Sequence, residues 1–240
     1  MNRWITTRNN HFIEWGVSFR EYTNEHHFNQ IKSVVETLLE SGERNNIYSL
    51  IEQTYTISYR YDRDGSYLSF MDEEYKIGRK NKVVLFDMHR DLSICKWKTP
   101  SKIAYFTPNG NEIIEEEVND LSSIPYNNSD EIEVSKIDSM PPVHIYGGIF
   151  RPNQRIVPHF RIGLFTDIWF PVVQLWSPKS EPYDNSMLAS RHTPKLNRFI
   201  RDVRQAAKDV GATWYMMNDR YEIAHPAYLD YVAEDGIILD

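Results

Sequence analysis

Aspartate and histidine alternate after one short apolar segment, and this pattern is the one most suited to chemistry. Asp87, His89 and Asp91 lie in the run FDMHRD. If a strand continues through that run, its period of two places all three side chains on one face. Carboxylates and an imidazole on one face can hold a metal ion or exchange protons with a substrate. His159, an isolated histidine beside an apolar run, could join them. The alternative is a plain turn between two strands, where Asp is common.

No known catalytic motif accompanies these residues. The sequence contains no G-x-S-x-G, P-loop, H-E-x-x-H or kinase motif. Gly147-Gly148 lacks both the spacing and the following helix that a phosphate-binding loop needs. The sequence therefore favours a protein that is not an enzyme, and it predicts no cofactor.

A second pattern is a local excess of acidic residues. Residues 112–138 contain nine acidic residues and one lysine, whereas residues 151–240 hold 11 of each sign. The net charge of −7 therefore arises before residue 151. Such a segment repels nucleic-acid phosphates and attracts basic proteins, although a solvated loop has the same composition. The acidic residues predicted to contact a partner are Glu112, Glu115, Glu116, Glu117, Asp120, Asp130, Glu131 and Glu133.

The first half of the chain should supply a strand, a helix and several hairpins. Residues 12–19 alternate as a strand does, and the helix that follows is expected to have Asn24 as N-cap and Gly42 as its end. Asp64-Gly65 and Asn109-Gly110 predict hairpin turns. We expect the further strands, arranged as an antiparallel meander, at residues 54–61, 66–70, 82–88, 92–97, 102–107 and 112–118.

Residues 119–142 are polar and acidic and are expected to form a long loop, where the chain could divide into two domains. After a strand at residues 144–150, the most apolar stretch, residues 156–176, is expected to form a central hairpin with Thr166-Asp167 at its turn. The alternative is a buried Asp167, which then needs a hydrogen bond or an arginine as partner.

A second amphipathic helix is expected near the C-terminus. Thr193 is predicted as its N-cap, Pro194 as its first residue and Gly211 as its end. Residues 213–217 then form a last short strand. The elements together predict an α+β fold: a largely antiparallel twisted sheet with two main amphipathic helices packed on it. Residues 1–240 are expected to form one domain, unless it is divided at residues 119–142.

Composition indicates where such a protein would work. The single cysteine, Cys95, excludes an internal disulfide and is compatible with a reducing compartment. The N-terminal residues lack the apolar segment of a signal peptide, and no apolar run reaches the roughly 18 to 20 residues of a membrane span. The sequence therefore predicts a cytoplasmic protein that does not bind membranes.

An acidic α+β chain with 15 Tyr and six Trp and no catalytic motif resembles, in general character, the immunity proteins of bacterial toxin systems. The resemblance implies a protein that neutralises a toxin by direct binding, and it assigns no residue. We therefore expect an immunity protein or antitoxin whose partner, such as a basic toxin domain, contacts the acidic segment and the aromatic side chains. The alternative is a metal-dependent hydrolase or transferase that uses Asp87, His89 and Asp91 or His159.

Overall fold

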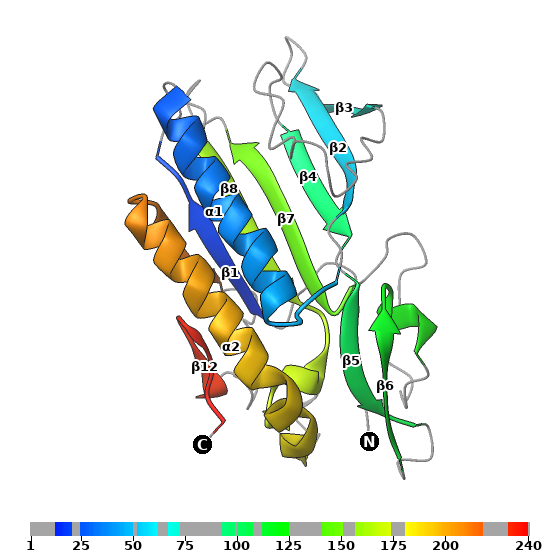
Figure 1. Ribbon diagram of the computed structural model, residues 1–240. Coiled ribbons are helices and arrows are strands. Elements are labelled where there is room, and N and C mark those ends of the chain that lie inside the picture. The colour runs from blue at the N-terminus through cyan, green and yellow to red at the C-terminus, as the bar shows by residue number, and fades with distance from the viewer. Residues whose placement is uncertain are drawn as a thin grey trace.

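Two helices cover one face of a seven-stranded antiparallel sheet, and a separate two-stranded ribbon lies beside one end of the sheet (Figure 1). The predicted α+β fold is therefore confirmed. The computed structural model describes residues 13–20, 25–49, 52–61, 67–72, 93–98, 100–107, 112–124, 141–150, 157–173, 181–217 and 230–239. Within these residues, no helix is both long and apolar enough to cross a membrane.

The helices among the described residues are α1 (Glu25–Arg44), α2 (Ser186–Asp209) and two short 3-10 helices, η1 (Leu121–Ser123) and η3 (Asp167–Trp169). The strands are β1 (Ile13–Ser18), β2 (Glu52–Tyr61), β3 (Tyr67–Asp72), β4 (Ser93–Lys98), β5 (Ser101–Phe106), β6 (Ile113–Val118), β7 (Val143–Phe150), β8 (Val157–Leu164), β9 (Val172–Val173), β10 (Tyr183–Asp184), β11 (Thr213–Met217), β12 (Val232–Ala233) and β13 (Gly236–Ile237).

The large sheet has the strand order β11-β1-β8-β7-β4-β2-β3. Both predicted hairpins are confirmed, since Tyr61 pairs with Tyr67 and Phe106 pairs with Ile113. The simple meander is wrong, because β2 lies between β3 and β4, β4 pairs with β7, and the β5–β6 pair forms its own sheet. Residues 13–17 of β1 are all buried, which suits a strand covered on both faces. The strand predicted at residues 82–88 lies outside the described residues.

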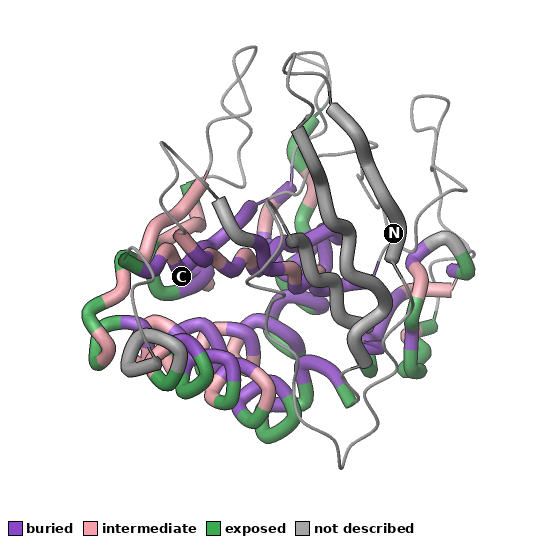
Figure 2. The backbone as a smooth tube through the Cα atoms, turned by 90° about the horizontal axis from the view of Figure 1, so that it is seen from above, coloured by how far each residue is buried: buried purple, intermediate pink, exposed green. Residues whose placement is uncertain are grey.

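The core lies between the sheet and the helices. Alternate residues of β1 and β8 point toward the helices, and they include Trp15, Val17, Phe160 and Ile162, all at most 1% exposed. Figure 2 shows the buried residues of α1 and α2 on the sides that face the sheet, with exposed residues on the outer sides. The helix residues of this core are Ile31, Val34, Val35, Leu38, Leu188, Leu196, Phe199, Ile200, Val203 and Ala207.

Part of the predicted loop at residues 119–142 also belongs to this core. Leu121 and Ile124 are 3% and 2% exposed, and both belong to the same apolar cluster as the helices. Residues 125–140 lie outside the described residues. A division into two domains at this segment therefore stays a prediction.

Gly42 lies inside α1, so the prediction that it ends the helix is wrong. The helix continues to Arg44, and the residue with positive φ is Asn46, at 52°. Gly42 is needed because the Tyr48 ring packs against the helix there: a Cβ on Gly42 would lie 1.9 Å from Tyr48 Cζ. Tyr48 is 1% exposed, and its hydroxyl donates to the Leu38 carbonyl at 2.7 Å.

Replacing Gly42 by alanine should therefore destabilise the protein. In an exposed helix this change stabilises by about 1 kcal/mol, but here the ring must move and the cost is about 1–3 kcal/mol. Urea unfolding followed by tryptophan fluorescence measures the effect. Gly42→Ala should cost much less in a Tyr48→Ala background, and an equal cost in both backgrounds would contradict the packing explanation.

The hairpin predicted for residues 156–176 is also wrong. β8 ends at Leu164, and Asp167 begins η3 instead of a strand turn. Asp167 is fully buried, as the alternative interpretation required, and the Tyr183 hydroxyl donates to its carboxylate. Asn185 Nδ2 also donates to the Asp167 carbonyl at 2.8 Å. Both partners immediately precede α2, so the corner positions the start of that helix.

α2 begins at Ser186, seven residues before the predicted N-cap. Asp184 accepts a hydrogen bond from the Ser186 N–H at 2.8 Å. The Ser186 side chain and this N–H bond together lower the pKa of Asp184. Thr193 is buried inside the helix, where its hydroxyl donates to the Trp169 carbonyl at 2.5 Å. Pro194 lacks an N–H, and the helix continues past it because tertiary packing outweighs that loss. The predicted end at Gly211 is confirmed by its φ of 71°.

Candidate functional site

Four of the predicted partner-binding residues lie together on β6 or directly before it. Glu112, Glu115, Glu116 and Glu117 are all exposed. With β5 they form a two-stranded sheet that we call the acidic ribbon, defined as residues 101–106 and 112–118 (Figure 1). Asp120 follows it and is half-buried. The other predicted residues, Asp130, Glu131 and Glu133, lie outside the described residues.

Neighbouring side chains orient three of these carboxylates. The Tyr105 hydroxyl donates to Glu116 at 2.6 Å, and the Ser49 hydroxyl donates to Glu117 at 2.7 Å. Lys102 lies 3.7 Å from Glu115, with both side chains largely exposed. Burial raises the pKa of Tyr105 to about 12, and its bond to Glu116 adds to the effect. The carboxylates are thus held in place while their outer sides stay open to solvent.

The ribbon is anchored to the core and to α2. Ile103, Tyr105 and Val118 are at most 2% exposed. The Nε2 atom of His192 in α2 lies 3.1 Å from the nitrogen of Ala104 and 3.1 Å from its carbonyl oxygen. Depending on the tautomer of His192, Nε2 accepts from the Ala104 N–H or donates to the Ala104 carbonyl. Burial lowers the pKa of His192 to about 4. The ribbon is therefore a fixed part of the molecular surface.

A second polar cluster lies on the sheet face opposite the helices. Tyr146, Arg161, Gly16 and Tyr215 stand side by side in register across β7, β8, β1 and β11. Gly16 leaves room for the Tyr215 ring, because a Cβ there would lie 2.2 Å from Tyr215 Cζ. Strand alternation adds Glu14 to the same face, and we call Glu14, Tyr146, Arg161 and Tyr215 the Glu14 cluster.

Three members of the Glu14 cluster share one hydrogen-bonded triangle. Glu14 Oε1 accepts from the Tyr146 hydroxyl at 2.8 Å and from Arg161 Nη1 at 3.2 Å, and the same Arg161 nitrogen lies 3.2 Å from the Tyr146 oxygen. The Glu14 side chain is 5% exposed and that of Arg161 is 26% exposed. Burial raises the pKa of Tyr146, and the Glu14 carboxylate raises it further. A buried carboxylate that is paired in this way joins three strands, which indicates a structural role.

The predicted metal site lies mostly outside the described residues, so it stays a prediction. Asp87, His89 and Asp91 lie outside the described residues, and His159 lies on β8. Burial lowers the pKa of His159 to about 4, and the positive charge of Arg161 contributes. That positive charge would also oppose a cation at this position. Across the described ranges, no three His, Cys, Asp or Glu side chains are grouped as a metal site requires.

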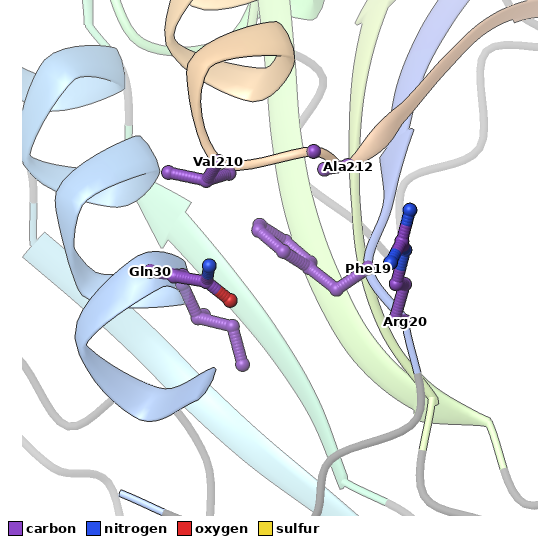
Figure 3. A pocket seen from close by; sticks show the side chains of 7 residues that line it. Phe19, Arg20, Gln30, Val210 and Ala212 are labelled. Carbon is purple, nitrogen blue, oxygen red and sulfur yellow. The ribbon is translucent and has the colours of Figure 1, made fainter. Parts of the chain in front are cut away.

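A small cavity lies between the end of β1 and the two helices. It has a volume of about 130 Å³ and is lined in part by Phe19, Gln30, Val210 and Ala212. Figure 3 shows the Phe19 ring pointing between Gln30 and Val210. Ligand sites usually measure roughly 300–1,000 Å³ and contain several convergent polar groups. This cavity is therefore a packing gap rather than a binding site.

A wider groove of about 600 Å³ runs between α2 and β11. Arg201, Arg204 and Lys208 line it together with Trp214. Arg204 already pairs with Glu234 at 2.5 Å, and Asp235 also lines the groove. Opposite charges are therefore mixed in this groove, and it favours neither an anionic nor a cationic ligand.

Comparisons of the chain with protein-family models, with curated proteins and with solved structures find no match. The fold and the candidate site together define the class: an α+β protein with an exposed acidic ribbon.

Sequence reasoning found the glutamates of the ribbon but missed the Glu14 cluster. Its members are spread over strands far apart in the chain, and Glu14 and Arg161 are 147 positions apart. The signal that could have found them is a single charged residue within an apolar strand, as Glu14 is in FIEWGVSF.

Proposed function

We propose that the protein is a non-enzymatic binding protein, an immunity protein or antitoxin that neutralises a toxin by direct contact with the acidic ribbon. The observation that supports the proposal most is the exposure of four glutamates on a ribbon that is anchored to the core. Complementary charge speeds the encounter with a basic partner and selects against acidic ones. Because the ribbon is anchored, little conformational entropy is lost when the partner binds.

The hydrogen bonds to the carboxylates of the ribbon support recognition over simple solubilisation. A solvated surface needs no fixed side-chain directions, yet Tyr105 and Ser49 each orient one carboxylate. Ile114, which is 37% exposed, lies on the same face of β6 as Glu116 and offers an apolar contact. An apolar centre with a polar rim is the usual composition of a protein interface.

Reversing the charge of Glu115, Glu116 and Glu117 to lysine should weaken partner capture by at least about tenfold, or 1.4 kcal/mol. The matched control reverses Glu36, Glu40 and Glu43, which are exposed on α1 and give the same change in net charge. Capture should stay within about twofold for this control, since long-range charge is screened at physiological salt.

The measurement is a pull-down at low and high salt of the protein encoded directly upstream of this gene, together with growth of cells that produce both proteins. Protection that depends on the ribbon glutamates is the expected outcome. Equal capture and equal protection by wild type, ribbon variant and control variant would show that the ribbon is not the binding site.

A further inference from the structure

The two edges of the acidic ribbon differ in how their backbone groups are satisfied. The Thr107 N–H donates to the Glu112 carbonyl at 2.8 Å, which identifies 107 and 112 as a hydrogen-bonded pair. In an antiparallel ladder such pairs alternate with pairs that do not exchange bonds. The N–H and C=O groups of Ile113, Glu115 and Glu117 therefore point away from β5, toward the outer edge of β6.

The corresponding outward groups of β5 are already covered in part. Ala104, opposite Glu115 in the register, points its N–H and C=O outward on the other side, and His192 contacts both. On the β6 edge, no described residue forms a hydrogen bond with the backbone of Ile113, Glu115 or Glu117. As far as the described residues extend, β6 is thus an open strand edge beside exposed side chains.

Open edges tend to pair with further strands, and proteins commonly protect them with charge. Two copies of β6 would place glutamates opposite glutamates, which is unfavourable. A strand that carries lysine or arginine gains favourable opposite-charge pairs in addition to its backbone bonds. The glutamates that exclude self-pairing therefore select a basic strand.

We propose that β6 binds its partner by strand addition, through an extended segment with Lys or Arg at alternate positions that pairs with the backbone of Ile113, Glu115 and Glu117. The inference rests on the proposed function and names the form of the partner. Glu115 and Glu117 lie on one face of β6, so basic residues at alternate positions meet both of them. On the opposite face an apolar residue would contact Ile114.

The test uses a fluorescent peptide of alternating lysine and threonine and its fully N-methylated counterpart, which has the same charge but no amide donors. Glu115→Pro removes one outward N–H and leaves the bonds to β5 in place, and edge strands accept proline at such positions. Glu115→Gln is the matched control that removes only the charge. We expect Glu115→Pro to weaken binding about tenfold and Glu115→Gln about two- to threefold. The methylated peptide should bind at least about tenfold more weakly to the wild type.

The outcomes separate the two proposals. If the methylated peptide binds the wild type as tightly as the unmethylated one, or Glu115→Pro behaves as Glu115→Gln does, strand addition is wrong while recognition by side chains stands. If neither peptide binds and charge reversal does not change partner capture, the acidic ribbon is not the site and both proposals fail. Self-association of the wild type that Glu115→Pro abolishes would assign the edge to a second copy of the chain instead. The peptide comparison uses wild-type protein, so it tests strand addition even if the proline variant does not fold.

Discussion

Replacing Arg161 by methionine is expected to lower the free energy of unfolding by about 3 kcal/mol, the low end for breaking a buried ion pair. The variant keeps the apolar stem but leaves the Glu14 carboxylate buried, with the Tyr146 hydroxyl still donating to it. Glu14→Gln should cost less, about 1 kcal/mol, because Arg161 is 26% exposed and can reach water. Urea unfolding of both variants and of the double variant measures the difference.

The double variant, Glu14→Gln with Arg161→Met, should be more stable than Arg161→Met alone, because it no longer buries a carboxylate that has lost the positive charge of Arg161. The matched control is Arg44→Met, which breaks a shorter contact: Arg44 lies 2.6 Å from Asp202, with its side chain 64% exposed. Solvent screens that pair, so its loss should cost at most about 1 kcal/mol. Equal losses for Arg44→Met and Arg161→Met would show that burial does not determine the strength of the Glu14 cluster.

Acidification from pH 6.5 to pH 4 is expected to destabilise the protein through His192, by on the order of 2 to 3 kcal/mol. Burial lowers the pKa of this histidine from 6.5 to about 4, Arg191 and Lys195 contribute to the lowering, and the Ala104 backbone and Glu115 oppose it. Between these pH values the unfolded chain binds a proton that the folded protein does not. The stabilisation is therefore complete above pH 6.5 and decreases as the pH falls toward 4.

His192→Gln should remove the His192 part of this pH dependence. His159, whose pKa burial also lowers to about 4, provides a second contribution that stays in the variant. The slope of unfolding free energy against pH should therefore fall to about half between pH 6.5 and 4.5. Carboxylates with lowered pKa values, such as Asp184 and Asp202, act below this window. An unchanged slope would mean that His192 is not buried in its neutral form.

Local patterns in the chain were sufficient to predict much of the fold. The turn residues Asp64-Gly65 and Asn109-Gly110 lie between strands that do pair, and Gly211 ends α2 with a positive φ. The 3.6-residue spacing of apolar residues in both helices matches their buried faces. These features follow from the conformational preferences of a few neighbouring residues, so they can be predicted without the rest of the molecule.

The candidate site was predictable in part. The glutamates at residues 112–117 are exposed, as their charge required, and the hairpin containing them follows from the Asn109-Gly110 turn. The N–H and C=O groups of alternate β6 residues point toward β5 or away from it. Which of them point away follows from the residue pairs that exchange hydrogen bonds with β5, as the Thr107–Glu112 bond shows. The contact of His192 with Ala104 joins residues 88 positions apart, and no local pattern predicts it.

By itself, the sequence determined the two amphipathic helices, most of the described strands and the acidity of β6, because each depends on local spacing and charge. Only the tertiary structure decided that Gly42 receives the Tyr48 ring, that α2 begins before Thr193, and that Asp167 is buried with Tyr183 as partner. It also assembled the Glu14 cluster from four strands. At Gly42, Thr193 and Asp167 a tertiary contact outweighs a local preference of about 1 kcal/mol, because a buried ring or polar group has only one favourable position.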